Sequence, residues 1–329
     1  MKAAVIGISG PALLPGEAEL LEAHPPAGVI LFARNILTRS QLAALAAALR
    51  RHLAPEAVLM VDQEGGRVAR LRPPAWHAHP PAAAIGAVFA RDPAAGERLA
   101  WLHGALIGRQ CAEAGFEVVT APVLDLAVAG ANAVVGDRAF AAEPAAVALL
   151  GGAMAAGLLA AGVQPVAKHA PGHGRAGTDS HLGLPVIAAA DLAADIAPFA
   201  ANAALPWMMT AHCLYPALDP DLPATLSAAI IGAVIRGRIG FAGVLLSDDL
   251  GMGALSGPIA ERAVAALAAG CDLALHCAGD EETARVLAAV PALGAESRAR
   301  LARARALAAE RREVLDSAAL TRERDRLLA

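Results

Sequence analysis

The sequence predicts a single α/β domain built as a closed barrel of eight parallel strands with helices around it. The first observation is that eight short apolar runs recur along the 329 residues, separated by helix-like stretches. The second is that ionisable residues gather where these runs end, which is where the active sites of such barrels form. The runs are Ala3–Ile8, Gly28–Ala33, Ala57–Val61, Glu117–Leu124, Val163–Ala167, Trp207–Ala211, Gly243–Ser247 and Leu273–His276.

The apolar runs are almost continuously hydrophobic, which suits strands that are buried on both faces of a parallel sheet. Eight repeated strand–helix units favour a closed (β/α)8 barrel, and an open doubly wound sheet is the alternative. No fixed-period repeat, low-complexity linker or clean boundary is visible in the sequence. We therefore expect one catalytic domain over residues 1–329.

Helix signals lie between the apolar runs. Thr38 with Gln41 forms a capping-box pattern, and Asp92-Pro93 reads as an N-cap followed by a first helical residue. Gly115 marks the end of the helix that Asp92 begins. Further helices are expected from Pro144 to Ala161, from Asp191 onward, and from Ser227 to Ile239.

The C-terminal segment, about residues 296–329, is rich in arginine. Its basic residues alternate with glutamates and aspartates. Mixed charge of this kind predicts a solvated helix and argues against a nucleic-acid-binding arm.

Composition and charge exclude several classes of partner. A net charge of −4 and a pI near 6.2 argue against binding to nucleic acid or to an anionic membrane. With only 3% aromatic residues, a stacking surface for single-stranded nucleic acid is not expected either. The four cysteines are scattered without metal-ligand spacing, so we expect them to be reduced and mostly buried. Reduced cysteines point to a reducing compartment, and we expect the protein to be cytoplasmic.

Two long uncharged stretches test the membrane alternative. Pro144–Ala167 is long enough to span a bilayer, but Gly162 divides it into a helix-like half and a strand-like half. Ile196–Leu218 contains prolines and a histidine and reads better as helix, turn and strand. The apolar run after Lys2 is shorter than the core of a signal peptide. The sequence therefore predicts no membrane segment.

Ionisable residues follow six of the predicted strands. Because the carboxyl ends of barrel strands converge, we expect their side chains to lie close together. They are Asp62, Asp125, Lys168 with His169, His212, Asp248 with Asp249, and His276.

Lys168 is unusual in this chain. Of its 27 lysines and arginines, only Lys2 and Lys168 are lysines. A lysine inside a chain that otherwise uses arginine suggests a site that needs a compact ammonium group, although a chance surface lysine is the alternative.

The segment from Lys168 to His181 contains the densest set of chemical groups. Its glycines and its proline predict a long loop after the fifth strand, and such loops are usually functional or mobile. Asp179 and His181 are two residues apart, so the carboxylate can orient the imidazole. Such a histidine could give a proton to a leaving group and later take one from water. A solvated polar loop is the alternative.

The same segment resembles the KH-x-PGHG-x4-D-[ST]-H signature of the β-N-acetylglucosaminidases of glycoside hydrolase family 3. One departure is Ala170, where relatives usually carry a bulkier residue such as Phe; this puts the loop packing in question but not the chemistry. Further matches run in the expected order over roughly residues 3–280. They are Gly28–Asn35, Val61–Val68, Gly136–Phe140, Met209–His212 and Leu246–Met252.

The resemblance implies a retaining hydrolase that removes terminal β-linked N-acetylglucosamine. Asp248 would be the nucleophile, and His181, oriented by Asp179, the general acid/base. Strand geometry alone leaves Asp248 and Asp249 open, because neighbours on a strand point to opposite faces; the resemblance selects Asp248. The residues expected to bind the hydroxyls of the sugar are Asp62, Arg70, Arg138, Lys168 and His169.

The single-barrel length resembles the bacterial cytoplasmic branch of the family that recycles peptidoglycan fragments. The implied substrate is a muropeptide of the GlcNAc-anhydro-MurNAc type, with no cofactor, and we expect a monomer. A β-glucosidase of the same family and a sugar-binding barrel without catalysis are the two alternatives.

Other candidate residues are given lesser roles. His77 and His79 form an HxH pair that could bind zinc with barrel histidines, but such a pair would be expected after the first strand, where Ile8-Ser9-Gly10 stands. We therefore expect no metal. Glu64 is expected to support its loop, with Arg67 as its partner. Asp125 and His212 are expected to line or brace the pocket, and Trp76, Trp101 and Trp207 to pack in the core.

Overall fold

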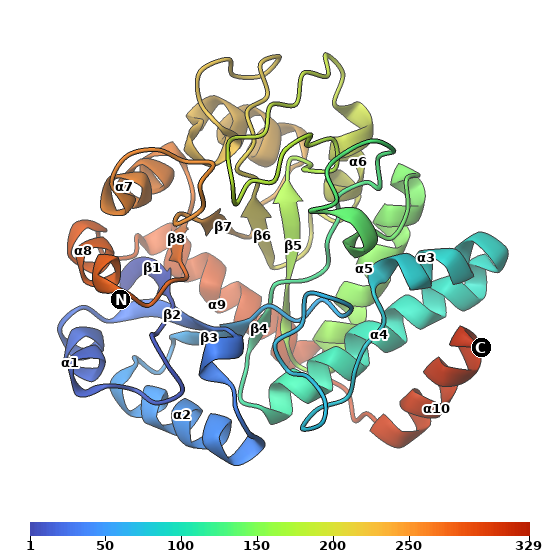
Figure 1. The fold of residues 1–329 in the computed structure, drawn as a ribbon, viewed down its shortest axis with the longest axis horizontal. Coiled ribbons are helices and arrows are strands. Elements are labelled where there is room, and N and C mark those ends of the chain that lie inside the picture. The colour runs from blue at the N-terminus through green and yellow to red at the C-terminus, as the bar shows by residue number, and fades with distance from the viewer.

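The computed structural model describes all of residues 1–329 and shows a closed barrel of eight parallel strands in chain order (Figure 1). The barrel closes because β1 pairs with β8, with Ala4 opposite Ala274. The predicted (β/α)8 barrel is confirmed, and the open sheet is excluded. The strands are β1 (Lys2–Ile6), β2 (Pro26–Leu31), β3 (Val58–Val61), β4 (Val118–Val119), β5 (Gln164–Ala170), β6 (Trp207–Thr210), β7 (Val244–Asp249) and β8 (Leu273–His276).

The strands place functional residues differently from the expectation in two cases. β5 extends to Ala170, so Lys168 and His169 lie within the strand and not after it. β7 likewise includes Asp248 and Asp249. β4 is much shorter than the predicted run Glu117–Leu124, although Val123 still forms an isolated parallel bridge with Lys168 beyond its end.

Alternating side chains on each strand form two apolar layers. On β3, Val58 and Met60 belong to the cluster inside the barrel, whereas Leu59 and Val61 pack outward against the helices. This alternation explains why the strands read as continuous apolar runs, since both faces are buried.

Helices surround the barrel (Figure 1). Two predicted caps are present: the hydroxyl of Thr38 accepts the N–H of Gln41, and the carboxylate of Asp92 accepts the N–H of Ala95. The helix expected from Ser227 is a π-helix. The helices are α1 (Pro15–Ala23), α2 (Arg39–His52), α3 (Ala82–Arg91), α4 (Pro93–Glu113), α5 (Pro144–Ala160), α6 (Ala193–Ala201), π-helical η4 (Ile230–Arg238), α7 (Ile259–Ala269), α8 (Glu281–Ala289), α9 (Ala295–Glu310) and α10 (Ser317–Leu328), with short 3-10 turns η1 (Ala33–Asn35), η2 (Gly136–Arg138) and η3 (Ala224–Leu226).

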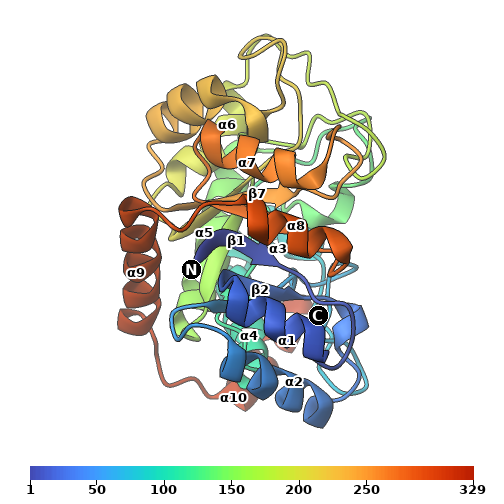
Figure 2. The same ribbon diagram turned by 90° about the vertical axis from the view of Figure 1, so that its left-hand side faces the viewer.

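The C-terminal segment forms two helices instead of the single solvated helix that we expected. α9 crosses the end of the barrel where β1 begins (Figure 2), and its Leu301 and Ala304 belong to the inner apolar cluster. Asp272, at the start of β8, accepts hydrogen bonds from Arg300 and Ser297 at 2.7 and 2.6 Å, which attach α9 to the barrel. The burial of α9 was not expected, because its apolar residues form a narrow stripe between many alternating charges. α10 is separate and lies against α4 (Figure 1).

The two uncharged stretches are divided as expected. Pro144–Ala167 forms α5 and the first half of β5, and the chain turns between them at Gly162, whose φ is +79°. No helix in the structure has both the length and the hydropathy needed to cross a bilayer. All four cysteines are buried and unpaired, as predicted.

Helices α4 and α5 touch backbone to backbone. A Cβ added to Gly104 would lie 2.0 Å from the carbonyl oxygen of Met154, and one added to Gly157 would lie 2.1 Å from that of Trp101. Neither backbone oxygen can move without separating the helices, so only glycine permits this approach.

We predict that Gly104→Ala lowers the free energy of unfolding by about 1–3 kcal/mol, because overpacking forces the two helices apart. Gly232→Ala in η4 is the matched control, since a Cβ there meets nothing within 4 Å. The control is expected to stabilise the protein by roughly 0.5–1 kcal/mol through reduced freedom of the unfolded chain. Urea unfolding curves measure both; equal effects would contradict the close contact.

Candidate active site

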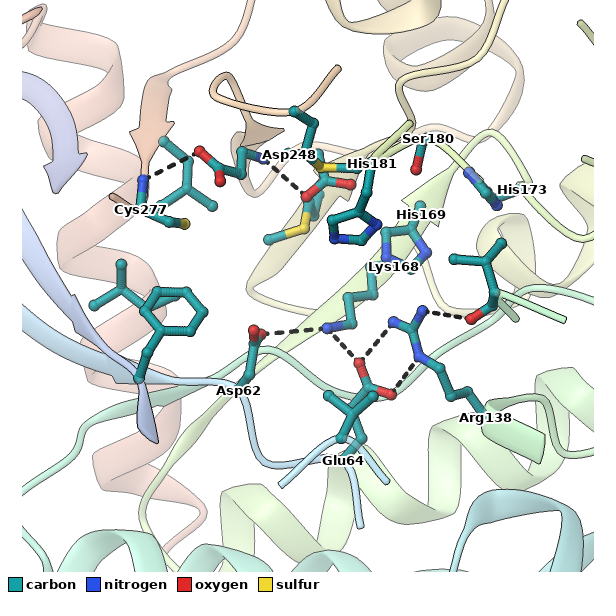
Figure 3. Close-up of a pocket in the computed structure, with 18 of the residues that line it drawn as sticks. Asp62, Glu64, Arg138, Lys168, His169, His173, Ser180, His181, Asp248 and Cys277 are labelled. Carbon is teal, nitrogen blue, oxygen red and sulfur yellow. Dashed lines mark hydrogen bonds and ion pairs between the residues drawn. The ribbon is translucent and has the colours of Figure 1, made fainter. Parts of the chain in front are cut away.

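A cavity of about 170 Å³ opens at the carboxyl ends of the strands (Figure 3). Every residue that the resemblance assigned to catalysis or to sugar binding lines this cavity, except Asp179, which forms a hydrogen bond with His181. The charged and imidazole side chains around the cavity are Asp62, Glu64, Arg70, Arg138, Lys168, His169, His173, His181, Asp248 and Asp249.

An ion network forms one wall of the cavity (Figure 3). The Nζ of Lys168 lies 2.6 Å from Oε1 of Glu64 and 3.5 Å from Oδ1 of Asp62. Arg138 donates two bonds of 2.8 Å to the two carboxylate oxygens of Glu64. Arg70 donates to Asp62 at 3.0 Å. Two carboxylates and three cations therefore hold one another in fixed positions.

The network keeps its carboxylates ionised despite their burial. Burial alone would raise the pKa of Glu64, but Arg138 and Lys168 outweigh it and lower that pKa to about 2. Burial acts in the same direction on Asp62, and there Lys168 and Arg70 hold the pKa well below its usual range. The wall thus presents fixed charges, with donors and acceptors, to a polyhydroxyl ligand.

The expected partner of Glu64 was wrong. Arg67 pairs with Asp137 at 2.8 Å and not with Glu64. The carboxylate of Glu64 instead lies inside the cavity, bound to Arg138 and Lys168. The signal that could have identified it is its place two residues after Asp62 in a short glycine-rich turn.

Both aspartates at the end of β7 face the cavity, although alternation along a strand would send one of them outward. An irregularity in the β7–β8 register between Leu246 and Asp249 breaks the alternation. Oδ1 of Asp249 accepts two backbone bonds, from the N–H of Cys277 at 3.1 Å and from that of Gly251 at 3.0 Å, which hold this carboxylate more firmly than that of Asp248. Asp248 accepts only the N–H of Asp249, at 2.8 Å through Oδ1, so its Oδ2 is available to a ligand.

The surroundings of Asp248 favour its ionised form. Burial raises the pKa of this carboxyl, but the imidazoles of His169 and His212 and the N–H of Asp249 outweigh burial and hold the pKa below its ordinary value. At neutral pH the cavity therefore contains an anion with one unshared oxygen, which is what nucleophilic attack requires.

Asp125 braces the site from behind, as expected. It does not line the cavity; one of its oxygens lies 2.6 Å from Nδ1 of His169, and the other accepts the backbone N–H of His173 at 2.6 Å. The neighbouring imidazole outweighs burial and lowers the pKa of Asp125 to about 2. The carboxylate thereby fixes the ring orientation of His169 toward the cavity.

Two other histidines at strand ends do not reach the cavity. His212 is buried and bridges Oγ1 of Thr225 at 2.7 Å and the carbonyl of Asp249 at 2.9 Å, so it supports β7. His276 pairs with Asp280 at 3.0 Å. No group of three histidine, cysteine, aspartate or glutamate side chains is placed to hold a metal ion.

The loop after β5 carries His181 to the mouth of the cavity. Its imidazole is 65% exposed, and Nδ1 lies 2.8 Å from Oδ1 of Asp179, the contact expected from their spacing. The loop is attached to the β7–α7 connection, because the carbonyl of Ser180 accepts the N–H of Ala254 at 3.0 Å and that of His181 accepts the N–H of Gly253 at 3.3 Å. The loop therefore lies over the strand end that bears Asp248.

His173 lies within the loop motif, but no role was expected for it. It is buried and lines the cavity, its ring lies 5.6 Å from that of His169, and neither of its ring nitrogens has a partner in the protein. Burial and the adjacent His169 lower its pKa to about 4, so the ring is neutral at neutral pH. A neutral imidazole can both donate and accept a hydrogen bond to a sugar hydroxyl.

The model of the glycosyl hydrolase family 3 N-terminal domain matches residues 13–308. A β-hexosaminidase from Alkalilimnicola ehrlichii is 44% identical over 295 residues, covering 87% of this chain and 84% of that protein. A β-hexosaminidase from Xylella fastidiosa is 41% identical over 280 residues, covering 83% of this chain and 82% of that protein.

Solved structures agree. NagZ from Neisseria gonorrhoeae in complex with N-trifluoroacetyl-D-glucosamine superposes with a TM-score of 0.78 at 32% identity, covering 93% of this chain and 98% of that one. A family 3 β-N-acetylglucosaminidase from Paenibacillus gives a TM-score of 0.85 at 31% identity, covering 99% of this chain and 66% of that longer chain. The chain therefore belongs to glycosyl hydrolase family 3, within which it is a glycoside hydrolase of the β-N-acetylhexosaminidase class.

Proposed function

We propose that the protein is a retaining exo-β-N-acetylglucosaminidase that acts on muropeptides derived from peptidoglycan, with Asp248 as the nucleophile. The observation that carries the proposal is that the ionised carboxylate of Asp248, whose Oδ2 has no hydrogen-bond partner, and the imidazole of His181 border one small cavity. The two named relatives are β-hexosaminidases, and this chain covers most of the length of each. They support the choice of N-acetylglucosamine.

The reaction proceeds in two displacements. In the first, Oδ2 of Asp248 attacks the anomeric carbon, the bond to the leaving oxygen breaks, and His181 gives that oxygen its proton. In the second, His181 takes a proton from water, the hydroxide attacks the anomeric carbon, and the bond to Asp248 breaks. Two inversions give net retention. An imidazole thus replaces the second carboxyl of the usual pair.

The cavity size supports action at the end of a chain. Pockets for drug-sized ligands span roughly 300–1,000 Å³, whereas this cavity holds about 170 Å³. We expect it to enclose one terminal sugar while the rest of the muropeptide stays outside. The residues that we expect to bind the sugar hydroxyls are Asp62, Arg70, Arg138, Lys168 and His169.

Assembly and compartment belong to the same proposal. We expect the protein to act as a monomer. Four unpaired, buried cysteines suit a reducing compartment such as the cytoplasm. No cofactor enters the proposed chemistry, and residues 1–329 would act as one catalytic unit.

We predict that Asp248→Asn lowers kcat for nitrophenyl N-acetylglucosaminide by roughly a thousandfold or more, because the amide cannot form the covalent intermediate. Asp249→Asn should lose less, since its main partners are backbone N–H groups. Intact-protein mass spectrometry with a slow fluorosugar substrate should detect a glycosyl adduct on the wild type and none on Asp248→Asn. Near-wild-type turnover by Asp248→Asn would overturn the assignment. Assays of the wild type with nitrophenyl glucoside, run in parallel, test the two alternative functions. A β-glucosidase would prefer the glucoside, and a sugar-binding barrel would cleave neither the glucoside nor the N-acetylglucosaminide.

For His181→Ala, we predict a loss that depends on the leaving group. An activated aryl group departs with little protonation, so its hydrolysis should fall much less than that of an unactivated disaccharide. Comparing kcat/KM for the two substrates in the variant and the wild type measures the difference. Equal losses on both would count against the acid role.

The attachment of the loop gives a further prediction. A Cβ at Gly253 would lie 2.7 Å from the carbonyl oxygen of His181, so Gly253→Ala must push the loop away from the cavity. We expect this variant to reproduce the leaving-group pattern of His181→Ala in weaker form. Gly177→Ala, in the same loop, is the matched control, since a Cβ there meets nothing within 4 Å. A Gly253→Ala enzyme with wild-type rates on the disaccharide would show that the attachment does not matter.

A further inference from the structure

A second cavity of about 450 Å³ lies outside the barrel opening, between α4, α10 and the loop that precedes α3. It shares no residue with the sugar-binding cavity. Three arginines, Arg39, Arg109 and Arg324, contribute to its lining, with Glu113 as the only carboxylate. Its lining is therefore positive, in contrast to that of the first cavity, where four carboxylates face three cations.

Unused hydrogen-bond donors gather around this second cavity. His79 and Gln110, which are 9% and 8% exposed, both line it. Neither ring nitrogen of His79 has a partner in the protein, and neither has Nε2 of Gln110 nor Nε of Arg109. Buried donors without acceptors are costly, and native proteins rarely leave several of them together.

Most of these unpartnered groups are donors. Gln110 uses its oxygen to accept the N–H of His77 at 3.1 Å, which leaves its amide nitrogen to donate. Burial, with His103 and Arg324 nearby, lowers the pKa of His79 to about 3. Its neutral ring carries one N–H and one acceptor nitrogen, so the unpartnered donors of His79, Gln110 and Arg109 together outnumber the single unpartnered acceptor.

The three guanidinium groups also keep free N–H groups. Arg39 donates only through Nε, to the carbonyl of Ala75, and its guanidinium lies 5.5 Å from the ring of Trp76. Arg109 uses Nη2 to bind Glu113 at 2.8 Å. Arg324 binds one oxygen of the adjacent Asp325 through Nε and Nη2. Each guanidinium group therefore keeps N–H groups without a partner, in the planar arrangement that matches a phosphate group.

We propose that this cavity is a binding site for a small phosphomonoester, whose phosphate oxygens supply the missing acceptors. The volume of about 450 Å³ lies within the range of natural ligand pockets, roughly 300–1,000 Å³. The excess of cations over carboxylates favours an anion, and the clustered donors favour one with several oxygens. The inference does not depend on the proposed hydrolase reaction.

The site joins the C-terminal helix to the barrel. One wall comes from α10, which is otherwise attached to α4 by Arg98, through bonds of 2.9 and 2.8 Å to Glu323. A bound phosphate would connect Arg324 of α10 with Arg109 of α4. Occupancy should therefore hold α10 against the barrel.

Isothermal titration of the full chain with inorganic phosphate, glycerol 3-phosphate and glycerol tests the proposal. We expect both phosphates to bind and glycerol not to bind. The double variant Arg109→Gln/Arg324→Gln should weaken both phosphates by about tenfold or more, since each removed fork was a charged donor. Arg285→Gln is the matched control, because Arg285 forms a similar pair with Glu282 on α8, away from the cavity.

A gain-of-affinity variant guards against loss through misfolding. Glu113→Gln frees Arg109 and removes the only carboxylate of the lining, so it should tighten phosphate binding several-fold. Asp248→Asn should bind phosphate like the wild type, which separates this site from the catalytic one. No binding of phosphate at millimolar concentration, binding undiminished in the double variant, or weaker binding by Glu113→Gln would each overturn the proposal.

Discussion

The buried ammonium of Lys168 is the interaction on which the catalytic end of the barrel depends. It lies between Glu64 and Asp62, which come from the segment after β3, while Lys168 itself belongs to β5. Breaking a buried pair by removing one partner leaves an uncompensated charge, which costs more than the pair gains by forming. The network therefore fixes the β3 segment relative to β5, and Arg138 extends the same constraint to the turn at η2.

The catalytic end then divides into a fixed part and a carried part. The fixed part comprises Asp248 at the end of β7 and the ion network, which Lys168 anchors to β5. The carried part is His181, which is mostly exposed and reaches the mouth on a loop held by two backbone bonds. This division suits the proposed reaction, in which Asp248 as nucleophile would need a fixed, desolvated position, whereas His181 as acid/base would also have to admit water.

Two departures from regular strand geometry shape the site. Register irregularities between Ala167 and Ala170 on β5, and between Leu246 and Asp249 on β7, interrupt the alternation of side chains. Residues that are adjacent in sequence can then face the same cavity, as His169 does beside Lys168. The opposite end of the barrel, where the strands begin, is covered instead by apolar side chains of α9.

The sequence by itself determined the features that local patterns encode. Continuous apolar runs specify strands that are buried on both faces, and eight such runs specify a barrel whose strand ends meet. The sequence alone therefore predicted that Asp62, Lys168 and Asp248 lie close together. The contact between Asp179 and His181 was predictable because the two residues are only two positions apart in the sequence. Only the tertiary structure decided that Glu64 binds Arg138 and not Arg67, since those partners are 74 residues apart and depend on how η2 lies against the barrel. The same holds for α9, whose surface charges are local but whose burial depends on the opening that the closed barrel leaves for it.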